Sequence, residues 1–592
     1  MANVNVKKNI EKGGDIIVKL LSGNEAIARG AYEAGVKVAC AYPGTPSTEI
    51  LENIAVYDGI NSEWSPNEKV AVEVAQGACF AGERALVAMK HVGVNVAADP
   101  LFSLAYTGVN GGFLVVSADD PGMHSSQNEQ DNRYYAKFMK MPLLEPSDSQ
   151  EAKDFVILGL ELSEQFDLPV FLRITTRIAH SKSLVVLREP LNREKRIYAK
   201  NTKKYVVMPS NARKLRITLE ERLQKLRIYL DTFPGNRAEG SGEDFAVITS
   251  GIAYQYAREA LGERATYLKL GFTYPLPEKA IREFAALHDT LYVIEEGEPF
   301  LEEQIRAMGV NVVGKEFFPA IGELNSQMIK EKLLGEKSSS MITSHNLPAR
   351  PPVLCPGCPH RGIFYVLNKV ADYITTDIGC YTLGTLPPLN AGELCLCMGS
   401  SIGNAFGMSK VMPDRKIVAT IGDSTFLHSG ITALMDVVYN RGKIILVILD
   451  NSTTGMTGHQ HNPSTGFTIK NEPTKKIDLE AMVRACGVEQ VWQISAYDLK
   501  QVNETLRAAI ACEETAVVIA KQPCVLINKR MARSYRIIHE NCKYCRSCLD
   551  IGCPAIGNRD GEIFINEVLC NGCAVCTQLC MFSAIEEDRG YT

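Results

Sequence analysis

Two runs of cysteines close to the end of the chain constrain its fold more than any other feature of the sequence. Each run contains four cysteines: Cys542, Cys545, Cys548 and Cys553 in the first, and Cys570, Cys573, Cys576 and Cys580 in the second. The first three of each run follow the spacing C-x2-C-x2-C, which lets three thiolates bind three corners of one [4Fe-4S] cube. The sequence therefore predicts a C-terminal module built around two iron-sulfur clusters.

In two-cluster ferredoxins the fourth cysteine of each run binds the other cube. This crossover predicts two ligand sets: Cys542, Cys545, Cys548 and Cys580 for the first cluster, and Cys570, Cys573, Cys576 and Cys553 for the second. Two departures from the usual pattern are present, because the first run has four residues before its last cysteine and Met581 follows the second run in place of proline. Structural zinc is the alternative, but eight cysteines at this spacing are more than two zinc ribbons usually show.

Composition excludes several classes of protein. The length of 592 residues suits about four domains, and an apolar content of 46% is ample for several buried cores. A net charge of -5 gives no argument for nucleic acid or an anionic membrane, and no segment approaches the ~20 apolar residues of a membrane helix. The charged N-terminal segment lacks the apolar region of a secretory signal. Eighteen cysteines, many at ligand spacing, indicate metal sites in a reducing compartment, so we expect a cytoplasmic location.

Short apolar runs alternate with helical stretches over most of the chain, which is typical of parallel α/β domains. The first group of runs is VKVACAY, RALVAMK, GGFLVVSADD and LPVFLRITT, the second is FAVITSG, TYLKLGF and TLYVIEEG, and the third contains KIVATIGDS and KIILVILDN. Between the first two groups lies a charged stretch without strand rhythm, which we predict to be a solvated connector with a basic helix. The Ser- and Pro-rich segment SSSMITSHNLPARPP is predicted to be a linker.

Polar residues follow two of the predicted strands. The strand KIVATI ends in Gly422, Asp423 and Ser424, and the strand KIILVIL is followed by Asn451 and Thr453. The carboxyl ends of parallel strands are where an open α/β sheet binds ligands. This pairing resembles the Mg-thiamin-diphosphate signature, although Ser424 stands where that signature has glycine. Carboxylate, amide and carbonyl oxygens suit Mg²⁺, and by the resemblance its ligands are Asp423, Asn451 and the carbonyl of Thr453.

Two further features fit a thiamin enzyme. Gly399 and Ser400 open a predicted helix whose backbone N-H groups could hold a diphosphate. Thiamin enzymes also need a glutamate that relays a proton to the aminopyrimidine ring, at the start of a helix and nine residues before a glycine. Glu68 has this spacing to Gly77. Glu73 is too close, so we expect it on the solvent face or in a structural role.

Thiamin motifs together with the cysteine tail resemble the 2-oxoacid:ferredoxin oxidoreductases over nearly the whole chain. The segment from Tyr42 to Ser47, YPGTPS, looks like that family's substrate loop, in which Thr45 would touch the carboxylate end of the substrate. Arg133 lies where the family has a substrate-binding arginine, and a guanidinium is a natural carboxylate clamp; a surface arginine is the alternative. The motifs CPGCPHR, DIGCYTLG and DNSTTGMTGH and the module order most resemble the large subunit of the branch that oxidises indolepyruvate.

The apolar runs and the stretches between them predict the domain boundaries, and the resemblance names the domains. They are a pyrimidine-binding thiamin domain at 15–182, a connector at 183–242, a transketolase-C-like domain at 243–336, a linker at 337–352, a diphosphate- and Mg-binding thiamin domain at 353–530, and a ferredoxin-like domain with two [4Fe-4S] clusters at 534–592. The expected fold class is α/β throughout the thiamin and transketolase-C-like domains.

A third cluster is possible by the same resemblance. Its ligands would be Cys355 and Cys358 of the CPGC pair, Cys380 and Cys524, while Cys395 and Cys397 are rival ligands. The apolar surroundings of the remaining four cysteines, Cys40, Cys79, Cys486 and Cys512, predict buried small hydrophobic residues. Four histidines on candidate active-site loops could move protons: His124, His428, His459 and His461.

The resemblance implies thiamin-diphosphate-dependent oxidative decarboxylation of aryl pyruvates such as indolepyruvate, giving aryl-acetyl-CoA, CO2 and reduced ferredoxin. Two enzymatic alternatives remain, a non-oxidative 2-oxoacid decarboxylase and an oxidoreductase for another 2-oxoacid. A pure electron-carrier subunit is a third, and the joint presence of Glu68, Asp423 and Asn451 argues against it. A small second subunit with the missing gamma-type domain, ferredoxin and coenzyme A are the expected partners, and a hetero-oligomer is the expected assembly.

Overall fold

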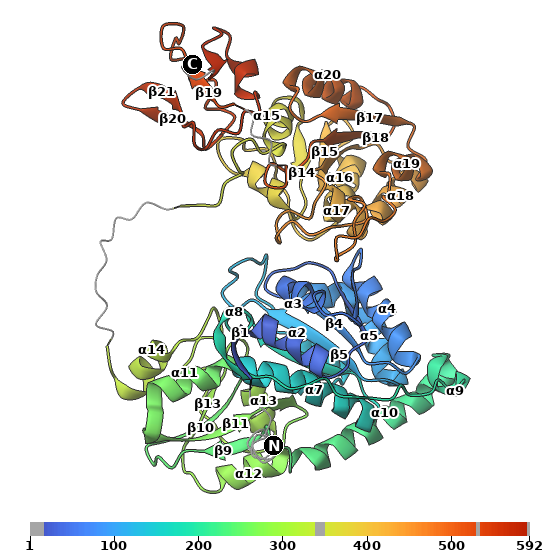
Figure 1. Ribbon diagram of the computed structural model, residues 1–592, viewed down its shortest axis with the longest axis vertical. Helices are drawn as coiled ribbons and strands as arrows, with labels where there is room; N and C mark the ends of the chain where they lie inside the picture. Colours follow the sequence, from blue (N-terminus) through green and yellow to red (C-terminus); the bar gives the residue numbers. More distant parts are fainter. Residues whose placement is uncertain (1–16, 338–349, 529–532, 589–592) are drawn as a thin grey trace. The chain divides into compact units, whose positions relative to one another are not determined.

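A computed structural model describes residues 17–337, 350–528 and 533–588 of the chain (Figure 1). It divides into two compact units, residues 1–343 and residues 344–592. The division falls inside the predicted linker, most of which lies outside the described residues. None of the helices in the described ranges is long and apolar enough to cross a membrane.

The first unit contains a seven-stranded sheet in the order β12-β6-β7-β5-β4-β2-β3. All neighbouring strands are parallel except β12, which is antiparallel to β6. The strands are β2 (Val38–Ala41), β3 (Asn61–Trp64), β4 (Ala85–Lys90), β5 (Phe113–Asp119), β6 (Leu143–Leu144), β7 (Val170–Thr175) and β12 (Phe272–Tyr274). The four strands predicted in this region are therefore confirmed as β2, β4, β5 and β7.

Helices cover both faces of this sheet because its strands are apolar on both sides. Phe113 and Val115 of β5 share a core with helices α4, α5 and α6, whereas Leu114 of the same strand faces Gly159 of α7. Helix α2 packs on α7 and on α3. The bounds are α2 (Gly23–Glu33), α3 (Thr48–Ile54), α4 (Glu68–Phe80), α5 (His91–Thr107), α6 (Arg133–Met139), α7 (Ser149–Phe166) and α8 (Thr176–His180). A two-stranded antiparallel sheet, β1 (Val18–Ser22) with β8 (Lys182–Val186), completes this domain.

The predicted solvated connector is wrong, because most of its helical part packs against the protein. It contains α9 (Thr202–Tyr205) and α10 (Pro209–Leu230). One face of α10 buries five leucines at helical spacing: Leu215, Leu219, Leu223, Leu226 and Leu230. Arg222 on the same face pairs with Asp167, which follows α7. The basic residues that suggest a solvated helix lie between the leucines. The leucines themselves form an apolar stripe with the 3.6-residue period of a helix.

The rest of the first unit is a four-stranded sheet in the order β13-β10-β11-β9. Its strands are β9 (Arg237–Glu239), β10 (Phe245–Ser250), β11 (Ala265–Leu270) and β13 (Leu291–Ile294), and its helices are α11 (Gly251–Leu261), α12 (Glu278–Ala285), α13 (Phe300–Ala307) and α14 (Ser326–Ile329). The three predicted strands are confirmed as β10, β11 and β13. Because β12 follows β11 in the chain and joins the larger sheet, the two domains share strands and a core.

The second unit contains a five-stranded parallel sheet in the order β14-β15-β16-β18-β17. Its strands are β14 (Tyr373–Thr375), β15 (Ile417–Gly422), β16 (Ile445–Asp450), β17 (Gln490–Ser495) and β18 (Ala516–Lys521), and its helices are α15 (His360–Val370), α16 (Ser400–Val411), α17 (Asp423–Thr425), α18 (Ile431–Tyr439), α19 (Leu479–Ala485) and α20 (Leu499–Ile510). The predicted central strands are confirmed as β15 and β16. Their carboxyl ends place Asp423 and Asn451 at one edge of the sheet.

The cysteine-rich tail has little regular structure of its own. It forms two short antiparallel pairs, β19 (Tyr535–Ile537) with β22 (Ile585–Glu587), and β20 (Ile556–Arg559) with β21 (Glu562–Ile565). Its apolar residues Ile551, Ile563 and Val575 belong to the same core cluster as α15 and α20. The tail is therefore folded onto one face of the parallel domain of its own unit.

Candidate functional site

Two buried carboxylates face each other at the ends of the central strands of the second unit. Asp423, the first residue of α17, is 2% exposed, and Asp450, the last residue of β16, is also buried. Burial and the negative charge of Asp450 together raise the pKa of Asp423 to about 7. Two carboxylates so close in a dry site repel each other, so this edge of the sheet favours a bound cation.

The oxygen-rich loop after β16 fits Mg²⁺. Asn451 and Thr453 are both buried, and the side-chain oxygen of Asn451 accepts the N-H of Thr453 at 3.3 Å. The Ser464 hydroxyl donates to Asp423 at 3.2 Å from the far end of the same loop. A carboxylate, an amide oxygen and backbone carbonyls are the hard ligands that Mg²⁺ prefers, so the residues present fit the ion. Sequence reasoning missed Ser464, for which no motif gives a signal.

The structure contradicts the prediction that Gly399 and Ser400 offer free backbone N-H groups to a diphosphate. The carboxylate of Asp377 accepts the N-H of Gly399 at 2.7 Å and that of Ser401 at 2.9 Å. The N-H of Ser400 donates to the carbonyl of Cys397 at 3.1 Å. Asp377, which is buried, thus occupies the positive end of α16 as a carboxylate cap. It lies in the DIGC motif, three residues before Cys380, and the motif alone gives no sign of this capping role.

Glu68 and Glu73 differ in the way that the sequence predicts. Glu68 is the first residue of α4, after the N-cap Asn67, and is 6% exposed. Its carboxylate packs so closely on α5 that a Cβ at Gly93 would come within 2.6 Å of Oε1. Glu73 points outward and pairs with Lys69 across one turn of the helix. A buried carboxyl at the carboxyl edge of the sheet has the surroundings that a proton relay needs.

The YPGTPS loop follows β2 and reaches the same edge of the sheet. The buried side chain of Asn24 donates to the carbonyl of Pro46 at 2.8 Å, and the Ser47 hydroxyl donates to the carbonyl of Gly44 at 2.7 Å. The carbonyl of Thr45 accepts the Ser125 hydroxyl at 3.4 Å. Within the described ranges the Thr45 hydroxyl has no hydrogen-bond partner, and this half-buried side chain is available to a ligand.

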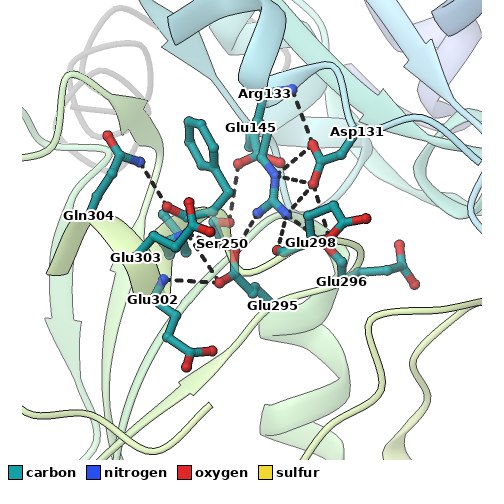
Figure 2. A network of polar contacts seen from close by, with 12 residues as sticks. Asp131, Arg133, Glu145, Ser250, Glu295, Glu296, Glu298, Glu302, Glu303 and Gln304 are labelled. Atoms are coloured by element: carbon teal, nitrogen blue, oxygen red, sulfur yellow. Dashed lines mark hydrogen bonds and ion pairs between the residues drawn. The ribbon is translucent and has the colours of Figure 1, made fainter. Parts of the chain in front are cut away.

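Arg133 does not serve as a substrate clamp, because its guanidinium is enclosed by acceptors of the protein (Figure 2). The side chain is 1% exposed. It donates to Asp131 at 2.5 Å and to Glu295, on the neighbouring domain, at 2.7 Å. The carbonyls of Glu296 and Glu298 accept further N-H groups at 2.8 and 3.0 Å. The structure therefore contradicts the predicted role, and Arg133 fastens α6 to the loop after β13.

Four cysteines that lie far apart in the sequence gather in the second unit. Burial raises the pKa of Cys358 to about 12 and that of Cys380 to about 11. Cys355 and Cys380 are neighbours that raise the pKa of Cys358 further by their negative charge when ionised, and Cys355 and Cys524 do the same for Cys380. These are the four ligands that the resemblance implies for a third cluster. Cys395 has Cys397 as a neighbour instead, and its sulfur lies 3.8 Å from the Thr382 hydroxyl.

The tail cysteines form two groups. Burial, followed by the neighbouring thiols of Cys573, Cys553 and Cys570, raises the pKa of Cys576 to about 12, and these four cysteines line one cavity. In the other group the pKa of Cys548 is raised by burial and by three thiol neighbours: Cys545, Cys542 and Cys580. Each group contains three cysteines of one run and the fourth of the other, which is the crossed pattern that two cubes require.

Each of these three groups brings four thiols together. Among residues 17–337, 350–528 and 533–588, no three His, Cys, Asp or Glu side chains come close enough to one point to share a metal ion. A structural zinc ion needs four ligands around one atom, whereas a cube spreads four thiolates over four irons. Four thiolates are the number that one [4Fe-4S] cube binds.

The cysteine groups are tied to one another and to the loop after β16. Arg361 donates to the carbonyl of Cys355 and to that of Gly552, beside Cys553. The N-H of Cys524 donates to the carbonyl of Asn451 at 2.9 Å, and a Cβ at Gly455 would lie 3.6 Å from the sulfur of Cys380. The third cysteine group thus adjoins the proposed magnesium loop on one side and the tail on the other.

The four candidate histidines have different surroundings. His428 is buried near Asp423, and its Nδ1 lies 3.0 Å from the Ser429 hydroxyl. His124 is half-exposed and pairs with Glu323 at 3.1 Å. His461 bonds Thr465 and Asn471, and His459 has a left-handed backbone in the same loop. Burial near the strand ends favours His428 among them.

Two family models match the chain. The one described as "Pyruvate flavodoxin/ferredoxin oxidoreductase, thiamine diP-bdg" matches residues 29–224, and "Thiamine pyrophosphate enzyme, C-terminal TPP binding domain" matches residues 377–520. Indolepyruvate oxidoreductase subunit IorA of Archaeoglobus fulgidus is 44% identical, with 96% of this chain and 97% of that protein covered. The IorA subunits of Methanothermobacter thermautotrophicus and Pyrococcus horikoshii are 42% and 39% identical over the same shares. The chain belongs to the IorA family of oxidoreductase subunits.

Family membership confirms the predicted relationship, the α/β class and an enzymatic role with thiamin diphosphate. The first matched region extends to residue 224, within α10, and the second ends at residue 520, within β18. A solved 2-oxoglutarate:ferredoxin oxidoreductase from Magnetococcus marinus aligns with 54% of this chain and 65% of that chain, at 19% identity and a TM-score of 0.45. That likeness is too partial to place any residue.

Proposed function

We propose that this chain is the large subunit of an enzyme that oxidatively decarboxylates aryl pyruvates such as indolepyruvate. One 2-oxoacid and one coenzyme A would give one acyl-CoA, one CO2 and one proton, and the two electrons released would reduce two ferredoxins. The observation that carries the proposal is the contact between the loop after β16 and the third cysteine group. Cys524 hydrogen-bonds the backbone of Asn451, and Cys380 lies beside Gly455 of the same loop. A non-oxidative decarboxylase has no use for an electron acceptor at this position.

The proposed cofactor roles follow from the surroundings of each residue. Asp423, Asn451 and the carbonyl of Thr453 would hold Mg²⁺, and Gly422 and Ser424 would border the diphosphate. Glu68 would relay the proton that activates the cofactor, and the hydroxyl of Thr45 would contact the substrate. Bound thiamin diphosphate would supply the nucleophilic carbon that attacks the keto group and holds the electrons left by CO2.

The proposed electron path runs through three clusters. The first is held by Cys355, Cys358, Cys380 and Cys524. The second is held by Cys553, Cys570, Cys573 and Cys576, whose cavity Cys358 also lines. The last is held by Cys542, Cys545, Cys548 and Cys580. Cys545 is exposed whereas the second group packs against the core of the domain, so the last cluster is the one that an external ferredoxin could approach.

We also infer a hetero-oligomer with a small subunit that carries the gamma-type domain, and a cytoplasmic location. The first inference rests on the family, whose members are named as subunits, and the second on eighteen cysteines that are all free thiols or candidate ligands. Iron-sulfur clusters in these numbers need a reducing compartment.

An anaerobic assay tests the function. The purified chain, with its small subunit, is mixed with coenzyme A, a ferredoxin and one member of a panel of 2-oxoacids. Indolepyruvate should give reduced ferredoxin and CO2 in a ratio of two to one, with coenzyme A consumed. Release of aryl acetaldehyde without ferredoxin reduction would support the non-oxidative decarboxylase, and faster turnover of 2-oxoglutarate or pyruvate would reassign the substrate.

A further inference from the structure

With Arg133 enclosed, the carboxylate of a 2-oxoacid needs another cation. The Thr45 loop and Glu68 lie at the carboxyl edge of the seven-stranded sheet. Lys90 is the last residue of β4, the strand next to β2, and the N-cap of α5. We propose that Lys90 binds the carboxylate of the 2-oxoacid together with Thr45. This inference rests on the proposed function and adds the residue that recognises the acidic end of the substrate.

The first support is the position of Lys90 relative to the Thr45 loop. A Cβ on Gly44 would lie 3.0 Å from the Cβ of Lys90 and 3.8 Å from its Cδ, so the aliphatic stem of the lysine packs against this loop. The ammonium donates to the carbonyl of Ser125 at 2.6 Å, and the hydroxyl of Ser125 donates to the carbonyl of Thr45. Ser125 therefore links the lysine to the loop with the unpartnered threonine hydroxyl.

The second support is the unused capacity of the ammonium. A lysine has three N-H donors, and one of them is used, on Ser125. No carboxylate of the described ranges lies within 4.0 Å of Lys90 Nζ, although the side chain is half-buried. A half-buried ammonium that is not directly paired with a carboxylate gains from binding an anion. The two remaining donors match the two oxygens of a carboxylate.

The charged group that faces Lys90 from the neighbouring loop is Asp120, and its carboxylate is already engaged. It accepts the N-H of Ser125 at 2.9 Å and the hydroxyls of Ser126 and Thr176 at 2.5 and 2.8 Å. His91, next on α5, bonds Asn128 instead. Burial lowers the pKa of Lys90 to about 8, while the charge of Asp120 opposes this shift. The amino group of Lys90 is therefore positively charged below about pH 8, and this charge is lost as the pH rises through that value.

A binding experiment on the holoenzyme tests the proposal without turnover. Indole-3-propionate carries the carboxylate but has no keto group, and its amide lacks the charge. The wild type should bind the acid more tightly than the amide, and Lys90→Met should lose that preference by weakening acid binding about tenfold to hundredfold, the range of a charge-assisted hydrogen bond. Lys90→Arg should restore it. Equal affinity of Lys90→Met and wild type for the acid would overturn the assignment.

Kinetics provide the second readout. In Lys90→Met the KM for the 2-oxoacid should rise by the same factor with kcat little changed, and the wild-type KM should rise above about pH 8 while that of Lys90→Arg stays flat. Lys315→Met is the matched control, because Lys315 is also half-buried and donates to a backbone carbonyl, that of Glu295. Iron content and bound thiamin verify that each variant is folded.

The two proposals can fail separately. If the wild type binds the acid but turns over no 2-oxoacid, the proposed function is wrong and the role of Lys90 in carboxylate binding is retained. If the wild-type KM does not depend on pH and Lys90→Met keeps the preference for the acid, the role of Lys90 is wrong and the proposed function is retained.

Discussion

At the scale of single residues, the thiamin chemistry of this account rests on two carboxylates in different surroundings. Glu68 begins a helix and packs on the glycine of another helix, so it can face a ring nitrogen in a dry site. Asp423 faces a second carboxylate, Asp450, and needs a cation. The first residue is suited to moving a proton and the second to holding a metal.

Asp423→Ala should lose bound thiamin diphosphate, because Mg²⁺ loses its carboxylate ligand. The fold should survive, since removal of the charge relieves repulsion with Asp450. Cofactor is measured after denaturation of the purified protein. Asp436→Ala, which removes an exposed carboxylate from α18 of the same domain, should keep the cofactor. Stoichiometric thiamin diphosphate in Asp423→Ala would remove the magnesium site from this edge of the sheet.

Glu68→Gln should bind the cofactor but exchange its C2 proton at least a hundredfold more slowly, since an amide cannot relay a proton. The exchange is followed by NMR after acid quench. Glu73→Gln is the control, because Glu73 pairs with Lys69 on the surface of the same helix. Normal exchange in Glu68→Gln would transfer the role to another group.

At the scale of elements, side chains from separate strands and loops make each site. The Arg133 network joins α6 to the loop after β13 (Figure 2). Removing one partner of a buried ion pair leaves the other uncompensated. Arg133→Met should therefore destabilise the first unit by about 3 to 5 kcal/mol and lower its melting temperature by ~10 °C. Arg177→Met, which breaks an exposed pair with Glu323, should cost less than about 1 kcal/mol.

This prediction separates two roles for Arg133. A structural arginine changes thermal unfolding and leaves the KM of the remaining folded enzyme unchanged. An increased KM with unaltered stability would restore the substrate clamp that the sequence suggested.

The third cysteine group also depends on several elements, because its members precede α15, follow β14 and follow β18. Cys524→Ala should remove about four irons from an anaerobically reconstituted protein that otherwise holds about twelve, since one cube has four irons. The tail clusters should stay reducible by dithionite. Cys395→Ala should keep all the irons, as Cys395 is grouped with Cys397. A wild type with only about eight irons would show that the four cysteines are structural.

The sequence predicts these elements well where the pattern is local. Strands β15 and β16 are apolar runs that end in a conspicuous polar motif, and Glu68 has a fixed spacing to Gly77. The carboxylate of Asp377 on α16 and the acceptors of Arg133 could not be predicted, because each partner lies on another element or domain. The proposed role of Lys90 could not be predicted either, because this residue belongs to no motif and the role follows from the loops that pack on it. The buried face of helix α10 is hard to recognise in the sequence, because the charged residues of the helix outnumber its leucines.

At the scale of the whole molecule, the chain combines a carbon-activating centre with an electron outlet. Glu68 and the Thr45 loop belong to the first unit, and the magnesium ligands and all the cluster cysteines belong to the second. The proposed function assigns the proton relay to the first unit, and the metal ligands and electron transfer to the second. It also requires that electrons from the substrate enter the clusters. This requirement distinguishes an oxidoreductase from a decarboxylase whose cysteine-rich tail takes no part in the reaction.

The most direct test is to mix the oxidised holoenzyme with indolepyruvate anaerobically, without ferredoxin, and to follow the visible absorbance and EPR signal of its clusters. The account predicts that the substrate reduces the clusters of the wild type. In Glu68→Gln they should stay oxidised, although dithionite still reduces them. Consumption of indolepyruvate by the wild type with its clusters left oxidised would contradict the account.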